Sequence, residues 1–295
     1  MHGDALKQYL RRSETFLGLE YSLDEAKYVA FGVPYDLTSS FRACSRYGPE
    51  MLRKFSSNLE SNSVNLEFDA RSVRLHDAGD VRFTYSLAAM LKRVFRVVKD
   101  IRRLGKTPLM VGGEHTFTMP AVMACFRDVE GVLIVFDAHF DLRDNYLGTR
   151  MNHATYLRRL LEKRKLKVAV VGVRGYDYDE LKTARELGIT YYTSKQIHDN
   201  LDQVLSRIRV FAGGRPAYVS VDIDVLDPAY APSVGNPEPN GITPYDLVEL
   251  LHAVCSPTIV GLDIMEVCSI YDNGLTAAQA TRVLVECITA IESKR

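Results

Sequence analysis

Short apolar segments recur along the chain and predict strands that are buried on both faces. They are rich in Val, Ile and Tyr and lack polar alternation, which is typical of a sheet covered by helices. The segments are residues 27–32, 107–111, 132–136, 167–173, 190–192, 217–221 and 258–262. Residues 71–80 are a further strand or a loop, because they end in Asp77-Ala-Gly-Asp80. We therefore expect about eight strands.

Amphipathic segments lie between several of these strands. Apolar side chains recur every three or four residues in them, which predicts helices with one buried face. These helices are expected at residues 87–104, 155–166, 196–210, 244–254 and 276–293. The alternation predicts a mostly parallel sheet with helices on both faces, an α/β fold. Because no linker, repeat or low-complexity tract interrupts it, we expect one domain over residues 1–295.

Composition and charge exclude some kinds of partner. Lys plus Arg and Asp plus Glu number 37 each, so no net charge attracts nucleic acid or an anionic membrane. The N-terminus lacks a signal-peptide pattern, and no apolar run is long enough to span a bilayer. The cysteines are odd in number and widely spaced, unlike a disulfide framework or a zinc ribbon. We therefore expect a reduced, cytoplasmic protein. The cysteines are Cys44, Cys125, Cys255, Cys268 and Cys287.

Acidic and histidine side chains follow four of the predicted strands. Functional groups of parallel sheets collect beyond the carboxyl ends of the strands. After residues 132–136 come Asp137, His139 and Asp141, which share one face of an extended chain. A capping or turn cluster would explain one aspartate here, but it explains two carboxylates and an imidazole poorly. Buried carboxylates need compensation, so these residues predict a bound cation.

The three other strand ends carry related groups. Asp222 and Asp224 share a face, whereas Asp227 before Pro228 predicts a turn. His115 follows two glycines at the end of residues 107–111, and taken alone it is better explained as a structural, hydrogen-bonded histidine than as a metal ligand. The last run ends in Asp263 and Glu266, and a salt-bridged carboxylate is the plainer alternative there.

Taken together, these ligands are too many for one tetrahedral ion. Two divalent cations that share carboxylates fit the set better. The donors are oxygen-rich with no thiolate, which favours Mn²⁺, although ligand type alone leaves Co²⁺, Ni²⁺ and Zn²⁺ open. The candidate ligands are His115, Asp137, His139, Asp141, Asp222 and Asp224.

Three segments identify the chain as similar to a known family. Gly-Gly-Glu-His-Thr at 112–116, Asp-Ala-His-Phe-Asp at 137–141 and Ser-Val-Asp-Ile-Asp-Val-Leu-Asp-Pro at 220–228 resemble the signatures of the ureohydrolases, the arginase and agmatinase family. The similarity extends from Phe-Gly-Val-Pro-Tyr at 31–35 and Arg-Tyr-Gly-Pro at 46–49 to Gly-Leu-Thr-Ala at 274–277. It implies a three-layer α/β/α, arginase-like fold with a parallel eight-stranded sheet and two Mn²⁺ ions.

The resemblance also assigns each ligand. One ion would take His115, Asp137, Asp141 and Asp222, and the other Asp137, His139, Asp222 and Asp224, so that Asp137 and Asp222 bridge. Homo-oligomers, trimers or hexamers, are the family expectation.

We hypothesise that a hydroxide bridging the two ions would attack the guanidinium carbon of a small cationic substrate, because metal coordination lowers the pKa of bound water. Glu266 would accept paired hydrogen bonds from the guanidinium. His153 would pass a proton to the leaving amine, although as a residue on its own it is equally well explained by a surface position. Residues 227–241 look like the agmatinase form of a substrate loop, which implies hydrolysis of agmatine to putrescine and urea in polyamine biosynthesis.

Other activities remain open at this point. A guanidinobutyrase or guanidinopropionase is the main competitor. An arginase is less favoured, because Asn152-His153-Ala-Thr-Tyr replaces the arginase segment that grips the amino-acid end. A histone-deacetylase-like zinc hydrolase would need an adjacent His-His pair, which the sequence lacks. An inactive subunit would not be expected to keep every ligand. The departures from the family pattern are Glu114, Thr116, Asn236 and Asn240.

Overall fold

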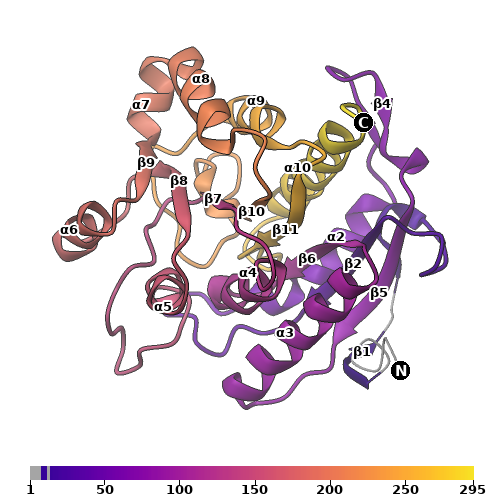
Figure 1. Ribbon diagram of the computed structural model, residues 1–295, viewed down its shortest axis with the longest axis horizontal. Coiled ribbons are helices and arrows are strands. Elements are labelled where there is room, and N and C mark those ends of the chain that lie inside the picture. Colours follow the sequence, from indigo (N-terminus) through magenta and orange to yellow (C-terminus); the bar gives the residue numbers. More distant parts are fainter. Residues whose placement is uncertain (1–7, 12–13) are drawn as a thin grey trace.

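The computed structural model describes residues 8–11 and 14–295 and is built around one twisted sheet (Figure 1). Its strands are β1 (Leu10–Arg11), β2 (Tyr28–Val33), β5 (Leu75–Val81), β6 (Thr107–Gly112), β7 (Val132–Phe136), β8 (Lys167–Val173), β9 (Thr190–Thr193), β10 (Ala217–Asp222) and β11 (Ile259–Met265). Their order is β1-β5-β2-β6-β11-β10-β7-β8-β9. All neighbours are parallel except the short edge strand β1, which pairs antiparallel with β5. The prediction of a mostly parallel, eight-stranded sheet is confirmed, with β1 added at its edge.

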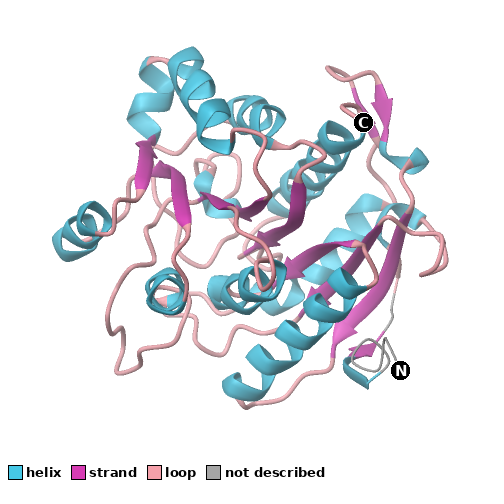
Figure 2. Cartoon of the chain, in the orientation of Figure 1, coloured by secondary structure: helices cyan, strands magenta, loops and turns pink. Residues whose placement is uncertain are grey.

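Helices cover both faces of the sheet (Figure 2). One layer packs α3 (Leu87–Arg103), α4 (Thr118–Cys125), α5 (Tyr156–Lys163) and α6 (Tyr178–Glu186) against it. The other layer packs α2 (Gly48–Ser56), α7 (Ser194–Asp199), α8 (Leu201–Ala212), α9 (Pro244–Val254) and α10 (Leu275–Glu292). Successive side chains of β7 alternate between the two cores: Ile134 joins one and Val135 the other. Both faces of the strand are therefore apolar, which explains its uninterrupted apolar sequence.

One predicted helix is wrong. The segment 196–210 is two helices, α7 and α8, which meet at Asn200. The backbone of Asn200 is not helical, and its side-chain oxygen accepts a hydrogen bond from Gln203 N at 3.0 Å. Asn200 thus caps the second helix, a position that asparagine favours.

Several elements were not predicted. They are α2, α4, α6 and a small hairpin of β3 (Asn62–Ser63) and β4 (Phe68–Asp69). Helix α4 is almost entirely buried, so it has no polar face and no amphipathic pattern to detect. The uncertain segment 71–80 contains β5, whose side chains alternate between buried and half-buried positions.

The cysteines differ from the expectation of unpaired thiols. Cys44 and Cys268 form a disulfide across a sequence separation of 224 residues. Cys125, Cys255 and Cys287 are free and buried. The N-terminal residues judged for a targeting signal, among them His2, lie outside the described residues. Within the described ranges, no helix combines the length and apolar character that crossing a bilayer requires.

Candidate metal centre

The four polar strand ends meet at the centre of the sheet. Strands β6, β11, β10 and β7 are consecutive neighbours, and all run in the same direction. Their carboxyl ends therefore lie side by side. At or just beyond these ends lie His115, Glu266, Asp222 and Asp137, in that spatial order, and Asp222 is the last residue of β10.

Asp137 lies between two imidazoles, with one carboxylate oxygen toward each. Its Oδ2 is 3.1 Å from Nδ1 of His115, and its Oδ1 is 3.5 Å from Nδ1 of His139. A carboxylate placed in this way can offer one oxygen to each of two cations. The geometry fits the bridging position expected of this residue.

Two further carboxylates surround His115. Oδ2 of Asp222 lies 3.1 Å and Oδ2 of Asp141 lies 3.6 Å from Nδ1 of His115. This nitrogen is buried and has no hydrogen-bond partner among the described residues. Asp141 has a φ of 54°, a left-handed conformation that is costly for a residue with a side chain and is often found at functional sites. An orphaned buried nitrogen that faces three carboxylates fits a cation site.

The second group forms around His139. Its Nδ1 lies 3.0 Å from Oδ2 of Asp224. The 3₁₀ helix Ile223–Val225 turns the chain immediately after β10 and so places Asp224 next to Asp222, whose Oδ1 accepts a hydrogen bond from Asp224 N at 2.9 Å. The other oxygen of Asp224 accepts from Ala138 N at 3.1 Å. This second hydrogen bond connects the segment after β7 to the segment after β10.

Burial makes it unfavourable for the carboxylates of this cluster to be ionised. Burial first, and then the charges of Asp224 and Asp137, raises the pKa of Asp222 well above its ordinary value. Burial and the charge of Asp137 do the same to the pKa of Asp141. Divalent cations would restore the ionised carboxylates. Two overlapping groups have ligand atoms within 4.8 Å of one another: His115, Asp137 and Asp141, and Asp137, His139 and Asp224. The donor set therefore fits two cations with Asp137 in common.

A cavity of about 280 Å³ opens above the cluster. Glu266 lies on its wall at the end of β11, with a φ of 60°. Its Oε1 accepts a hydrogen bond from His115 N at 2.8 Å. Burial raises the pKa of Glu266 to about 8. The strained backbone and the buried carboxylate are typical of a ligand-binding residue.

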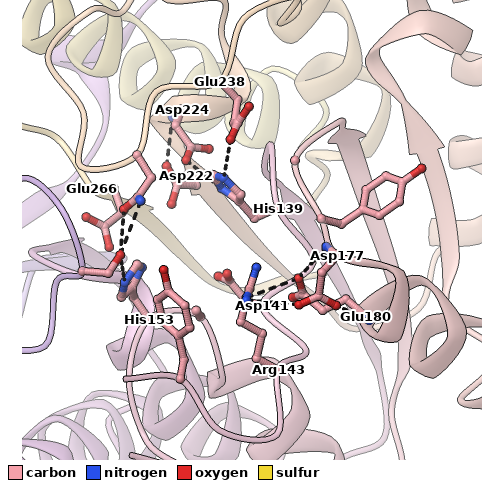
Figure 3. A pocket seen from close by; sticks show the side chains of 16 residues that line it. His139, Asp141, Arg143, His153, Asp177, Glu180, Asp222, Asp224, Glu238 and Glu266 are labelled. Carbon is pink, nitrogen blue, oxygen red and sulfur yellow. Dashed lines mark hydrogen bonds and ion pairs between the residues drawn. The ribbon is translucent and has the colours of Figure 1, made fainter. Parts of the chain in front are cut away.

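His153 lies on the same wall of the cavity (Figure 3). Its Nε2 is 3.0 Å from the hydroxyl of Ser40, which is also 3.4 Å from the amide nitrogen of Asn236. Burial, followed by the charge of His139, lowers the pKa of His153 to about 4. The imidazole is therefore neutral at pH 7.

The opposite wall contains residues that the sequence did not reveal. The guanidinium carbon of Arg143 lies 4.6 Å from the ring centre of Tyr146. Arg143 also pairs with Asp177 at 3.1 Å and with Glu180 at 3.5 Å (Figure 3). A signal existed for the last two, because they follow the carboxyl end of β8 in a capping box. Ser40 gave no signal, because it reaches the cavity from a loop 113 residues before His153.

Glu114, one of the departures from the family pattern, connects the wall of the cavity to the loop that carries Ser40. It is fully buried and accepts hydrogen bonds from Thr38 N at 2.8 Å and from the hydroxyl of Thr116 at 2.6 Å. The two departures at 114 and 116 therefore form one hydrogen-bonded unit outside the cluster.

The remaining described histidines have local partners. His76, His198 and His252 contact Tyr21 O, Gly241 O and the Glu286 carboxylate respectively, at 2.8, 2.9 and 2.9 Å. Asp227 forms the predicted turn and accepts from Ala229 N and Gly241 N, both at 2.9 Å.

Fold and cluster together define a class, the three-layer α/β proteins with an oxygen-rich site for cations at the carboxyl edge of a parallel sheet. The Arginase family matches residues 26–290, and the chain belongs to that family. It is 33% identical to the agmatinase of Pyrococcus horikoshii over 89% of this chain and 91% of that protein. Identity to the guanidinopropionase of Pseudomonas aeruginosa is also 33%, over 90% and 87% of the two chains.

A solved structure shares the fold over nearly the whole length. The agmatine ureohydrolase of Thermoplasma volcanium has a TM-score of 0.87 and 33% identity, over 98% of this chain and 97% of that chain. The chain is therefore an enzyme of the ureohydrolase type.

Proposed function

We propose that the protein is a binuclear manganese hydrolase that releases urea from a guanidino compound, with agmatine as the preferred substrate. The observation that carries this proposal is the pair of histidine and carboxylate groups that share Asp137 beneath a cavity with Glu266 on its wall. One cation would be held by His115, Asp137, Asp141 and Asp222, and the other by Asp137, His139, Asp222 and Asp224.

Manganese is the metal that the donor chemistry favours. The cluster offers carboxylate oxygens and two imidazoles but no thiolate. Two divalent cations held by these residues would lower the pKa of bound water and would so supply the nucleophile at neutral pH.

Glu266 would orient the substrate. A planar guanidinium donates paired hydrogen bonds to a carboxylate, and Glu266 is a buried carboxylate that lines the cavity next to His115 of the cluster. Its pKa of about 8 would fall when a guanidinium binds, because the neighbouring positive charge favours the ionised form.

His153 would pass a proton to the leaving amine. When the carbon–nitrogen bond breaks, the oxygen of water stays in urea, and the departing amine must gain a proton. A neutral imidazole held by Ser40 at the cavity wall can relay that proton.

The charge of the opposite wall supports a cationic substrate tail. Asp177 and Glu180 line the cavity there, and Glu238 lines it beside His139, with its Oε1 3.8 Å from Nε2 of His139 (Figure 3). Among the described residues that line the cavity, Arg143 is the only arginine or lysine. The net negative charge favours the ammonium group of agmatine over a carboxylate. The second candidate, a guanidino acid such as guanidinobutyrate, is supported by Arg143 itself, whose side chain is 34% exposed and could pair with a carboxylate.

Steady-state kinetics with a panel of substrates tests the proposal. The protein is loaded with Mn²⁺, and urea release is measured with agmatine, arginine, guanidinobutyrate, guanidinopropionate and free guanidine. Agmatine should give the highest kcat/KM. A higher value for guanidinobutyrate would overturn the substrate but leave the reaction standing. No urea from any substrate at full Mn²⁺ occupancy would overturn the reaction.

A further inference from the structure

A fully buried carboxylate, Asp263, lies behind the metal cluster and outside the cavity. It accepts hydrogen bonds from three hydroxyl groups: Ser220, Tyr218 at 2.7 Å and Thr118 at 2.8 Å. It forms no ion pair with any described residue, contrary to the salt bridge considered for this position. A buried carboxylate held only by hydroxyl groups is costly, so it needs a structural or functional reason.

Strand register brings this carboxylate to the metal site. Asp263 on β11 is the direct partner of Ser220 on β10, so the two side chains lie next to each other on one face of the sheet. Ser220 in turn precedes Asp222 by two residues. The hydroxyl oxygen of Ser220 lies 2.9 Å from Nε2 of His115.

The number of hydrogens fixes the direction of this chain of hydrogen bonds. A serine hydroxyl has one hydrogen, and that of Ser220 is donated to Asp263, which also accepts the hydroxyl hydrogens of Tyr218 and Thr118. The Ser220 oxygen must therefore accept from Nε2–H of His115. Its Nδ1 then carries the lone pair, and this is the nitrogen that faces Asp137 and Asp222.

We propose that Asp263 is a positioning residue for the metal centre: acting through Ser220, it holds the proton of His115 on Nε2 and so presents the Nδ1 lone pair to a cation. Asp263 itself touches neither cation nor substrate. This inference rests on the metal centre of the proposed function. The hydroxyl of Tyr156, 3.1 Å from the same Nε2, is placed to accept alongside Ser220.

Replacing Asp263 by asparagine tests the direction of the hydrogen bonds with little change in shape. The amide nitrogen of the Asp263→Asn variant can donate to Ser220, which would then donate to Nε2 of His115 and leave the hydrogen on Nδ1. That tautomer cannot bind a cation through Nδ1. Outer groups that orient a metal ligand are worth 10–100-fold in affinity, so we expect a loss of about that size for one of the two Mn²⁺ ions.

Tyr218→Phe is the matched control. It also removes a hydrogen bond to Asp263, but it leaves the bond between Ser220 and Asp263 in place. Its Mn²⁺ affinity should stay near that of the unmodified protein. Ser220→Ala should weaken binding as Asp263→Asn does, and the double variant should be no weaker than either single one, because both changes break the same chain of contacts.

Calorimetric titration of Mn²⁺ into metal-free protein measures these affinities, and thermal unfolding of the metal-free variants checks that each one is folded. Equal affinity in Asp263→Asn and the unmodified protein, or an equal loss in Tyr218→Phe, would overturn the role of Asp263. Additive losses in the double variant would also overturn it. If the unmodified protein binds no Mn²⁺, the metal centre of the proposed function fails instead.

Discussion

Asp137 shows how one side chain can organise a two-cation site. Because its two oxygens face different imidazoles, removing it affects both ligand groups at once. Asp227 lies only a few residues beyond Asp224 but accepts hydrogen bonds from the backbone amides of Ala229 and Gly241. Replacing Asp137 therefore tests the metal centre, whereas replacing Asp227 tests the folding of the loop that it stabilises.

Asp137→Ala should lose both Mn²⁺ binding and urea release. We expect activity to fall by more than about 100-fold, since even outer groups around a metal are worth 10–100-fold. Metal content after gel filtration and urea release measure the two effects. Asp227→Ala is the control: it should lower the thermal midpoint while the Mn²⁺ content stays unchanged. Full activity in Asp137→Ala would rule out the metal assignment.

At the scale of elements, Glu286 joins three parts of the fold. It lies on α10 and accepts hydrogen bonds from Ser63 of β3 at 2.6 Å and from His252 of α9 at 2.9 Å. Burial alone would raise the pKa of Glu286, but the hydrogen bonds from His252 and Ser63 outweigh it and lower the pKa. The ionised carboxylate therefore stabilises the packing of these elements.

Glu286→Gln should lower the free energy of unfolding by about 2 kcal/mol at pH 7, because hydrogen bonds to a charged group are lost. The pKa of Glu286 is lower in the folded protein than in the unfolded chain. Its contribution is thus complete above the ordinary glutamate pKa and disappears as the pH falls through the lowered value. Denaturant unfolding at pH 7 and pH 4 measures this, and the difference between the two proteins should shrink at pH 4. A constant difference would contradict the assignment.

Element boundaries could be predicted where a local pattern marks them. Strands β7 and β8 and helix α9 match their predicted ranges, because apolar runs and a proline at the helix start are signals within the sequence. The break at Asn200 was missed because apolar periodicity continues across it. Helix α4 was missed because surrounding elements bury all of its sides.

At the scale of the whole molecule, the disulfide joins distant segments beside the site. Cys44 follows the loop that carries Ser40, and Cys268 lies two residues after Glu266. Crosslinks that close long loops restrict the unfolded chain strongly, by about 2–5 kcal/mol in many proteins.

Of the five cysteines, we expect three to react with a thiol reagent in denatured, unreduced protein and all five after reduction. The Cys44→Ser/Cys268→Ser double variant should unfold at a lower temperature than the oxidised protein and at the same temperature as the reduced one. Five reactive thiols without reductant would show that the bond is absent.

Metal removal should also destabilise the whole fold, because the buried carboxylates lose their compensating charge. A ligand at 100 times its Kd adds about 2.7 kcal/mol to the free energy of unfolding. Mn²⁺ should therefore raise the thermal midpoint of chelator-treated protein, and Asp137→Ala should show no such rise. A thermal midpoint that changes with neither chelator nor Mn²⁺ would argue against a metal centre in this fold.

The sequence by itself determined the layered α/β fold and the residues of the candidate cluster, since apolar runs and the polar groups after them are local features. Asp137, His139 and Asp141 could be grouped because an extended chain places alternate residues on one face.

Only the tertiary structure decided which strand ends are neighbours, and therefore which oxygen of Asp137 faces which imidazole. It alone brought Ser40 to His153, Asp263 to Ser220 and Cys44 to Cys268. These contacts depend on strand order and register, and nothing in either local segment specifies its distant partner.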